Sequence, residues 1–444
     1  MRKHKSTILG LASLLIFSSI LGACNQATST GPHLIVYSGI QNDRINFMIF
    51  DADGRGRRII QLPEDSSIHH SSSLHVSPDG NWIAFHTGLI PSTGLTLNLF
   101  HLPDENVRPI AEVMANDYEN IGIDFIEYIK TLQWSPDGRY LAYAKQVEGS
   151  ISDVYVYDTQ TQTSWRLTYD LQRVDSIFWS DDEEWVLYRA SNPYVPSYNS
   201  ALRAVKFGNT SVKQSEVLES GQWLAAGGPS PESIFLFDVG DGFCCGDLRH
   251  INIESGSKTL LWKGVFADHA FDFQNQIIGL SAEPSRGSND SEPAIDGGLY
   301  LISLNGSHKK ISDDIYPWLE FWGTIPPRFV GHYGKGVFTI SEDGLTKQLS
   351  KKDKQFVSIS PDNNWLAVYG QDGLDLFNSE NELERTAMVG SISTVQWRPD
   401  SMGLFIFADG VYYLSMVDDN QPVLLERCTI EGCRFDGYNS KWLP

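Results

Sequence analysis

The sequence lacks the features that mark the common catalytic, nucleic-acid-binding and helical classes of protein. It has 34 Lys and Arg against 55 Asp and Glu, a net charge of −21, so its surface repels phosphate backbones, and this charge disfavours both nucleic-acid binding and attachment to anionic lipid through basic patches. No G-x-S-x-G, H-E-x-x-H or P-loop motif is present. Helical periodicity is also absent, since the best candidate, Tyr118 to Lys130, is equally well a loop. The sequence predicts no catalytic machinery and no cofactor.

The one long apolar run lies at the amino terminus. "MRKHK" is followed by the apolar stretch Ile8 to Leu21 and then by "LGAC", which ends at Cys24. This segment resembles a bacterial lipoprotein signal, and an ordinary secretory leader with a chance cysteine is the alternative. The resemblance implies a signal peptide over 1–23, acylation of Cys24 including palmitate-type chains, and a lipidated tether over 24–32. It predicts a bacterial membrane lipoprotein that faces the extracytoplasmic side.

Cysteine is scarce, with five residues in all. Once Cys24 is assigned to the anchor, four remain: Cys244, Cys245, Cys428 and Cys433. An even number in an exported chain is compatible with two disulfides. In one connectivity, Cys428 and Cys433 form a local disulfide, and the second disulfide is then a strained bond between the adjacent residues Cys244 and Cys245. In the other, two disulfides link the 244–245 pair to Cys428 and Cys433. No C-x-x-C spacing accompanies them, so a zinc site is not predicted.

A short phrase that recurs along the chain is the strongest signal in the sequence. "LQWSPDGRYLAYAK" has copies that begin at residues 74, 177, 357 and 395, and the residue before each turn is Ser77, Ser135, Ser180, Ser360 or Arg398. Ser135 and Ser180 are 45 residues apart, and Ser180 and Ser360 are 180 residues apart, which is four times 45. The gap therefore predicts three weaker copies, and alternating apolar segments at the right spacing supply them.

Each copy predicts four strands, here called a, b, c and d in chain order. The first unit, from His33, has only b, c and d, whereas the chain finishes with "SKWLP", in which Pro444 lies 45 residues after Pro399. A final strand a is thus available to complete the first unit and to close a ring without exposed edges. We predict an all-β fold in which 33–444 is a single β-propeller of nine four-stranded blades. Eight blades remain the alternative, and two smaller propellers are disfavoured because no linker interrupts the middle.

The repeated residues also explain why each copy folds. In Ser-Pro-Asp-Gly, proline presets φ, serine or aspartate bonds turn amides, and glycine occupies the position where a side chain would obstruct the hairpin. An aromatic residue follows five positions after the aligned serine, at Trp82, Tyr140, Trp185 and Trp365. Regular recurrence at one structural position predicts packing between sheets rather than a binding stripe.

The quoted repeats, with "DVYVYDTQTQTSWRLTYD" and "MIFDADGRGRRIIQL", resemble those of the TolB-type, WD-repeat-like propellers. The resemblance covers nearly all of the mature chain. It implies the propeller fold and the binding of proteins or saccharides, and it supplies no catalytic residues. TolB-type proteins carry an additional amino-terminal domain, and here an acyl anchor takes its place.

Three segments resemble metal sites superficially. "DADG" at Asp51 falls where a c–d turn belongs and lacks the other ligands of a calcium loop. Histidines lie together in "HHSSSLH", with another interpreted as part of a neighbouring loop: His69, His70, His75 and His86. An acidic insert contains Asp290, Glu292 and Asp296. All three are interpreted as solvated or turn residues, and no metal site is predicted.

The connections differ in length between the two ends of the predicted strands. The a–b turns are short, whereas long insertions fall in b–c connections ("HTGLIPSTG", "ASNPYVPSYNS", "DVGDGFCCGD", "AEPSRGSNDSEPAIDGG") and d–a connections ("MANDYENIGIDFIEYIK"). We call the end that carries the b–c and d–a connections the loop face. Binding residues concentrate on loops held by a rigid scaffold. The candidate ligand-binding residues there are Tyr194, Tyr198, Asn192, Asn199, Tyr118 and Asp117, although these tyrosines could equally just fix their own loops.

The sequence thus predicts a membrane-anchored, non-catalytic module that binds an envelope protein or glycan through the loop face. The alternative is an envelope polysaccharide lyase or hydrolase with its active site at the mouth of the central channel, because propeller enzymes draw residues from several blades. A third class, an architectural subunit, would expose a broad apolar patch. Clustered His, Arg and carboxylates at the mouth would favour the enzyme, and an apolar, tyrosine-rich rim would favour the binder.

Overall fold

The computed structural model describes residues 33–443 with several gaps in the connections. The residues outside the described part of this range are 42–43, 62–73, 88–94, 115–130, 150, 171, 193–199, 209–214, 221–222, 228–229, 231–232, 239–245, 273–275, 285–295, 324–327, 352–353, 388–389, 419–420 and 428–440. The described strands all belong to one compact unit, Pro32–Pro444.

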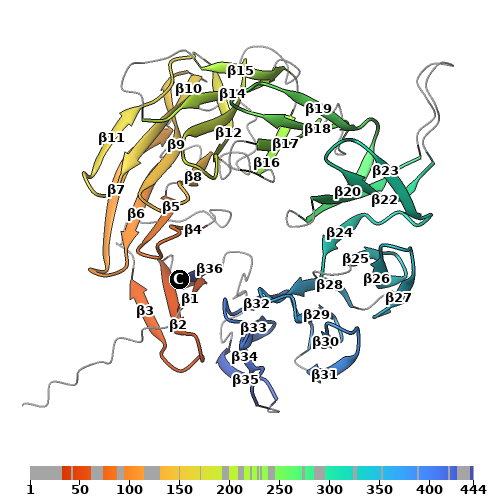
Figure 1. Cartoon of the computed structure of the whole chain (residues 1–444). Coiled ribbons are helices and arrows are strands. Elements are labelled where there is room, and N and C mark those ends of the chain that lie inside the picture. Colours follow the sequence, from red (N-terminus) through yellow and green to blue (C-terminus); the bar gives the residue numbers. More distant parts are fainter. Residues whose placement is uncertain are drawn as a thin grey trace, which may run out of the picture. The chain divides into compact units, whose positions relative to one another are not determined.

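The described residues form nine four-stranded antiparallel sheets, which we number 1 to 9 in chain order (Figure 1). This confirms the all-β class and the count of nine blades, including the three weaker copies, which are sheets 5, 6 and 7. No helix occurs in the described part of the chain, so no described segment is a helix of the length and apolarity needed to cross a membrane.

The bounds of the strands follow the predicted a, b, c and d segments. Sheet 1 contains β36 (Lys441–Leu443), β1 (His33–Gln41), β2 (Arg44–Asp51) and β3 (Arg58–Gln61). Sheet 2 contains β4 (His75–Val76), β5 (Trp82–Thr87), β6 (Leu95–His101) and β7 (Asn106–Met114). Sheet 3 contains β8 (Leu132–Trp134), β9 (Tyr140–Glu148), β10 (Ile151–Asp158) and β11 (Thr163–Arg166). Sheet 4 contains β12 (Arg173–Trp179), β13 (Trp185–Ser191), β14 (Ser200–Lys206) and β15 (Glu216–Ser220).

The remaining five sheets repeat this order. Sheet 5 contains β16 (Trp223–Gly227), β17 (Ser233–Asp238), β18 (Leu248–Asn252) and β19 (Lys258–Trp262). Sheet 6 contains β20 (Phe266–Asp272), β21 (Ile277–Ala282), β22 (Gly298–Ser303) and β23 (His308–Ser312). Sheet 7 contains β24 (Trp318–Phe321), β25 (Arg328–Tyr333), β26 (Gly336–Ser341) and β27 (Thr346–Gln348). Sheet 8 contains β28 (Lys354–Ile359), β29 (Trp365–Gly370), β30 (Gly373–Asn378) and β31 (Leu383–Ala387), and sheet 9 contains β32 (Thr394–Trp397), β33 (Gly403–Phe407), β34 (Gly410–Ser415) and β35 (Val423–Arg427).

The two ends of the chain meet in sheet 1, as the phase of "SKWLP" predicts. β36 pairs antiparallel with β1, with Leu34 opposite Trp442. The last strand of the sequence therefore takes the position of strand a beside strand b, and the first sheet becomes four-stranded like the others. This pairing covers the edge that β1 would otherwise present to solvent.

Apolar side chains fill the space between successive sheets. Among the described residues, nine clusters of buried hydrophobic residues each join two neighbouring sheets. One of them joins the last sheet to the first, since Met48 and Phe50 of β2 pack with Phe405 and Phe407 of β33. The closure of the ring thus has a hydrophobic part as well as a strand pairing, and burial of these side chains is its main stabilising contribution.

Tryptophans at the ends of inner strands bond neighbouring sheets to each other. The indole Nε1–H of Trp134 donates to the carbonyl of His75 at 2.8 Å, and that of Trp179 donates to the carbonyl of Gln133 at 3.1 Å. Trp397 donates in the same way to the carbonyl of Ser358 at 3.1 Å. In each case a buried indole finds its partner on strand a of the preceding sheet, which explains why a tryptophan stands directly before the aligned residue.

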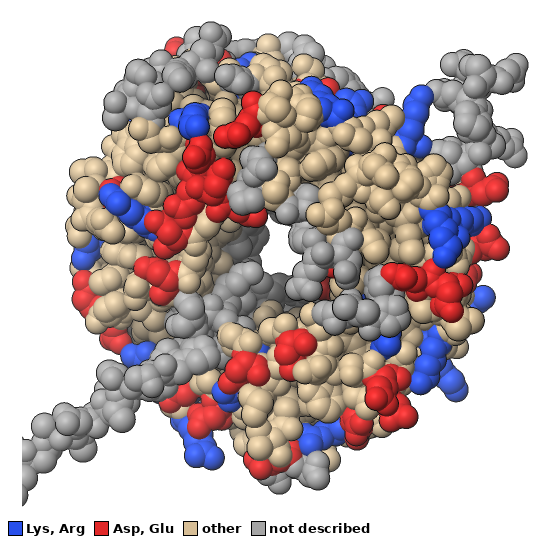
Figure 2. Space-filling model, viewed as in Figure 1, with Lys and Arg blue, Asp and Glu red and all other residues tan. Residues whose placement is uncertain are grey.

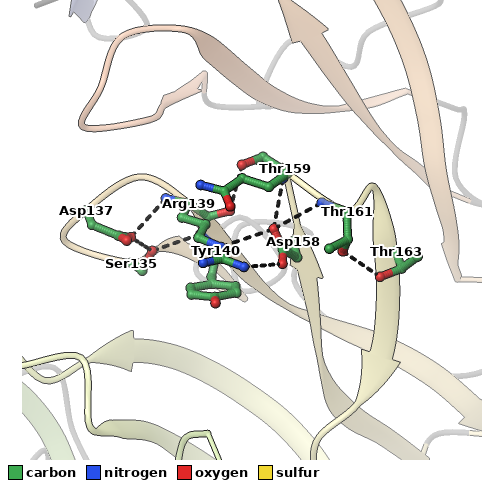
Figure 3. A network of polar contacts seen from close by, with 9 residues as sticks. Ser135, Asp137, Arg139, Tyr140, Asp158, Thr159, Thr161 and Thr163 are labelled. Atoms are coloured by element: carbon green, nitrogen blue, oxygen red, sulfur yellow. Dashed lines mark hydrogen bonds and ion pairs between the residues drawn. The ribbon is translucent and has the colours of Figure 1, made fainter.

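The repeated turn is held by one hydrogen-bond pattern, seen for sheet 3 in Figure 3. The hydroxyl of Ser135 donates to Asp137 Oδ1 at 2.6 Å and accepts from the backbone N–H of Tyr140 at 2.9 Å. Gly138, the third residue after the serine, has φ of +76°, a left-handed conformation that glycine adopts without strain. The predicted turn chemistry is confirmed, and Asn363 fills the equivalent position of sheet 8 at φ of +59°.

Basic side chains on the outermost strands reach carbonyl groups of the next sheet. Lys347 Nζ donates to the carbonyl of Asn381 at 2.7 Å, and Arg385 Nη2 donates to that of Asp418 at 2.9 Å. At the junction of the first and last sheets, Arg57 Nη1 lies 2.7 Å from Glu426 Oε2. Figure 2 shows many Lys and Arg side chains toward the outer strands. These contacts connect neighbouring sheets through basic side chains. They also place charged groups on the outer strand edges, which disfavours pairing with another chain.

A glycine in β25 allows an unusually close approach between a strand and an aromatic ring. A Cβ at Gly331 would lie 2.4 Å from Tyr316 Cδ1, whereas a Cβ at Gly334 would meet nothing within 4 Å. Tyr316 is fully buried and cannot move aside cheaply. We expect Gly331→Ala to lower the free energy of unfolding by about 1–3 kcal/mol, and Gly334→Ala to change it little, in chemical denaturation. Equal effects of the two substitutions would contradict this account of the packing.

Candidate functional site

The strand bounds place the long insertions where the sequence predicts them. The b–c connections of sheets 2, 4, 5 and 6 and the d–a connection between sheets 2 and 3 are long, whereas β25 and β26 are joined by two residues, 334–335. Of the six predicted ligand-binding residues, only Asn192, directly after β13, is described, and it is partly buried. The other five, Tyr194, Tyr198, Asn199, Tyr118 and Asp117, lie outside the described residues, as do the anchor Cys24 and the remaining cysteines Cys244, Cys245, Cys428 and Cys433.

Polar side chains at the loop face of sheets 3 and 4 form three sets of contacts. In the first, Asp153 at the start of β10 forms an ion pair with Arg166, which ends β11. Asp153 Oδ1 also accepts from the hydroxyl of Thr168 at 3.0 Å and from the backbone N–H of Asp170 at 3.2 Å. The carboxylate is buried and fully bonded, so its role is to hold the d–a connection in place.

The second set surrounds Asp170. Its carboxylate accepts hydrogen bonds from the hydroxyls of Tyr188 and Ser215, the latter at 2.8 Å, and Arg203 Nη1 lies 3.8 Å away. Burial, with a further contribution from Asp170, raises the pKa of Tyr188 well above its ordinary value. Tyr188 therefore stays protonated and acts as a donor at every physiological pH.

The third set lies at the bulge of β12. Arg173 Nε donates to Asp175 Oδ1 at 2.7 Å, and Arg189 Nε lies 3.6 Å from Asp175 Oδ2. Both arginine side chains are largely buried. Two guanidinium groups thus contact the same carboxylate.

Tyr169 is an exposed aromatic residue at this end, and it is not among the residues predicted from the sequence. It lies in the d–a connection between β11 and β12, is 50% exposed, and has the Arg166 guanidinium 4.0 Å from its ring centroid. Phe356, near the start of the inner strand β28, is also half exposed. The only available signal for Tyr169 was its place directly after "WRLT", at the boundary of a predicted d strand.

Two carboxyl groups with raised pKa lie on neighbouring inner strands. Burial, together with the charge of Asp268, raises the pKa of Glu320 in β24 to about 7. Burial raises the pKa of Asp268 in β20, although its Oδ2 accepts from the backbone N–H of Leu319 at 2.7 Å. Burial lowers the pKa of the adjacent His269 to about 4, so this imidazole is neutral. Such perturbed groups are typical of functional sites, although structural pairs show them as well.

The structure also bears on the residues considered for metals. His86 does not lie on a loop as expected, because β5 extends through Thr87 and pairs with β6, with His86 opposite Leu97. It is buried, and burial lowers its pKa to about 4. His75 lies in β4, and Asp51 begins the c–d turn as predicted, with Gly54 N–H donating to its carbonyl at 2.8 Å. Asp296 is exposed, and its carbonyl accepts from the hydroxyl of Tyr300, whereas His69, His70, Asp290 and Glu292 lie outside the described residues.

Within the described part of the chain, no group of three or more His, Cys, Asp or Glu residues is arranged to hold a metal ion. Asp268, Glu320 and His269 are accordingly not proposed as a metal centre. Among the described side chains at the loop face, the chemistry is that of ion pairs, hydroxyl groups and the exposed aromatic rings of Tyr169 and Phe356.

Comparison with known proteins identifies the fold and no family. No family model matches the chain, and no curated protein matches its sequence. Among solved structures, the chain is similar to a eukaryotic initiation factor, with 14% identity, coverage of 93% of this chain and 99% of the other, and a TM-score of 0.59. It is also similar to Porphyromonas gingivalis dipeptidyl peptidase 4, with 13% identity, a TM-score of 0.51, and coverage of 86% of this chain and 64% of that one.

TolB from Acinetobacter baumannii matches with 17% identity over 63% of this chain and 62% of its own, at a TM-score of 0.33, which is too low to support an argument. The structures that match include both an initiation factor and a peptidase, so fold similarity does not decide between binding and catalysis. The chain is a nine-bladed β-propeller.

Proposed function

We propose that the chain is a lipid-anchored, extracytoplasmic binding module that holds an envelope protein or glycan through its loop face without catalysing a reaction. One observation carries the proposal. At the loop face of sheets 3 and 4, the carboxylates of Asp153, Asp170 and Asp175 are all engaged by arginine or hydroxyl partners, while Tyr169 is exposed. Bonded carboxylates stiffen a surface, and an exposed tyrosine on a stiff surface contributes contact area at low entropic cost.

The anchor is part of this proposal. Residues 1–23 would be removed as a signal peptide, Cys24 would carry the acyl chains, and 24–32 would connect them to the propeller over 33–444. We expect Cys24→Ser to move the protein from the membrane fraction to the soluble fraction, since the chain would then lack its lipid. Cell fractionation with an antibody to the propeller measures this. Retention in the membrane after the substitution would show that another segment attaches the protein.

The binding role is tested with the mature Cys24→Ser protein, used to capture partners from native envelope and on a glycan array. We expect Tyr169→Ala to weaken the captured interaction by about tenfold or more, because aromatic anchors contribute most of the energy at such surfaces. Leu345→Ala is the matched control, since Leu345 is 72% exposed but lies in a c–d turn at the opposite ends of the strands. Equal weakening by both variants, or no partner on either assay, would contradict the proposal.

A second candidate function rests on Asp268 and Glu320. A buried carboxyl group whose pKa is about 7, beside another carboxyl group, has the properties of a general acid in polysaccharide hydrolysis. Incubation of the protein with purified envelope polysaccharides, with detection of new reducing ends, tests this. Release that is abolished by Glu320→Gln would establish the enzyme instead of the binding module.

A further inference from the structure

Two polar groups at the end of β13 have no hydrogen-bond partner. Among the described atoms, neither Ser191 Oγ nor Arg189 Nε makes a hydrogen bond, and both atoms are buried. Ser191 is 3% exposed. Buried polar groups in native proteins nearly always have a hydrogen-bond partner. Two such groups without a partner at one place are therefore typical of a site that binds a polar ligand.

The sheet register places these groups together. Arg189 and Ser191 are two positions apart in β13, so their side chains point to the same side of the sheet. Ser191 lies opposite Arg173 of β12, whose side chain is therefore on that side as well. Asp175, at the register shift of β12, contacts both arginines. The side chains of Arg173 and Arg189 retain 20% and 17% exposure, so solvent reaches part of each guanidinium-bearing side chain, whereas Arg189 Nε and Ser191 Oγ themselves are buried.

The donor groups of this cluster favour a ligand that carries a carboxylate. Two guanidinium groups face one aspartate, and the Arg189–Asp175 separation of 3.6 Å is too long for a hydrogen bond. Arginine binds planar carboxylates in preference to other groups because its N–H donors match their geometry. A serine hydroxyl beside it supplies one further donor. An extended polyanion is disfavoured because the chain as a whole carries a net charge of −21.

A peptide fits this place less well than a sugar. Carboxyl termini of peptides are commonly captured by free backbone N–H groups, and extended peptides add to free sheet edges. β13 is paired with β12 from Val186 to Ser191 and with β14 along its whole length, so at this end it offers neither. We propose a subsite for the carboxylate of a small sugar acid, formed by Arg189, Ser191 and Arg173. This proposal rests on the proposed binding function and specifies the class of ligand that the loop face takes.

The test compares D-glucuronate with D-glucose, which lacks the carboxylate, by calorimetric titration of the mature Cys24→Ser protein. We expect glucuronate to bind and glucose to bind at least about tenfold more weakly. Arg189→Gln should abolish this preference, and Arg189→Lys should retain part of it. Asp175→Asn should strengthen glucuronate binding, because it removes the carboxylate that competes for both arginines. A gain in affinity cannot arise from misfolding.

The possible outcomes separate this inference from the proposed function. Binding of glucuronate that is unchanged in Arg189→Gln, or weakened in Asp175→Asn, would overturn the subsite. Preferential binding of a peptide with a free carboxyl terminus would overturn the sugar as ligand. No binding of glucuronate, combined with a partner captured through Tyr169, would overturn the subsite and leave the proposed function intact. Failure of both assays would overturn both.

Discussion

Deletion of residues 441–444 is expected to destabilise the propeller and to make it associate with itself. The deletion removes β36 and its pairing with β1 at three positions, of which Leu34 opposite Trp442 is the central one. The lost hydrogen bonds alone correspond to about 2–4 kcal/mol. The edge of β1 then carries unpaired N–H and C=O groups that another molecule can pair with.

Thermal unfolding and size-exclusion chromatography with light scattering measure the two effects. Deletion of Pro444 alone is the control, because it shortens the chain and leaves β36 complete. We expect this control to unfold at the temperature of the full-length protein and to remain in the same oligomeric state. Equal behaviour of both deletions would show that the buried cluster of Met48, Phe50, Phe405 and Phe407 closes the ring unaided.

Glu320→Gln is expected to stabilise the protein above neutral pH. Burial raises the pKa of Glu320 from 4.5 to about 7, so the folded state holds a proton that the unfolded state has released. The favourable contribution of the protonated carboxyl group is fully present below about pH 4.5 and is lost as the pH rises through 7. The difference amounts to at most about 3 kcal/mol, and an uncharged glutamine avoids the loss.

Chemical denaturation of both proteins at pH 5 and pH 8 checks this expectation. The free energies of unfolding should diverge at pH 8, with the variant the more stable, and should lie close together at pH 5. Glu382→Gln, at an exposed position in the turn before β31, is the matched control and should behave like the unsubstituted protein at both values. Parallel pH profiles for Glu320→Gln and the unsubstituted protein would show that this carboxyl group is solvated in the folded state.

The fold could be predicted in detail because its information is local and repeated. The a–b turns of sheets 2, 3, 4 and 8 each combine a serine, an aspartate and a residue with positive φ, such as Ser135, Asp137 and Gly138, within a few positions of one another. Where the turn residues had diverged, as in sheets 5 to 7, the constant spacing still located the strands. The error at His86 had a local cause, because β5 continues past "WIAF" for two further residues.

The candidate site could be predicted only in part, because its residues meet through packing between sheets. Asp268 and Glu320 are 52 positions apart in the chain, and no motif connects them. Asp175 reaches two arginines through a register shift that the alternation of side chains does not indicate. The sequence located the loop face through the lengths of the connections. It did not identify Tyr169, whose exposure depends on how Arg166 and Asp153 hold the connection after β11.

The pairing of β1 with β36 has a consequence for biogenesis. Eight of the nine hydrophobic clusters among the described residues join sheets that follow each other directly in the sequence, so these can form while the polypeptide is still being synthesised. The ninth cluster joins the first sheet to the last, and so does the Arg57–Glu426 ion pair. The pairing of β36 with β1 likewise joins the two ends of the chain. Until β36 has been synthesised, β1 has no partner on this side, and we expect chaperones that shield unpaired strands to act on this nascent end.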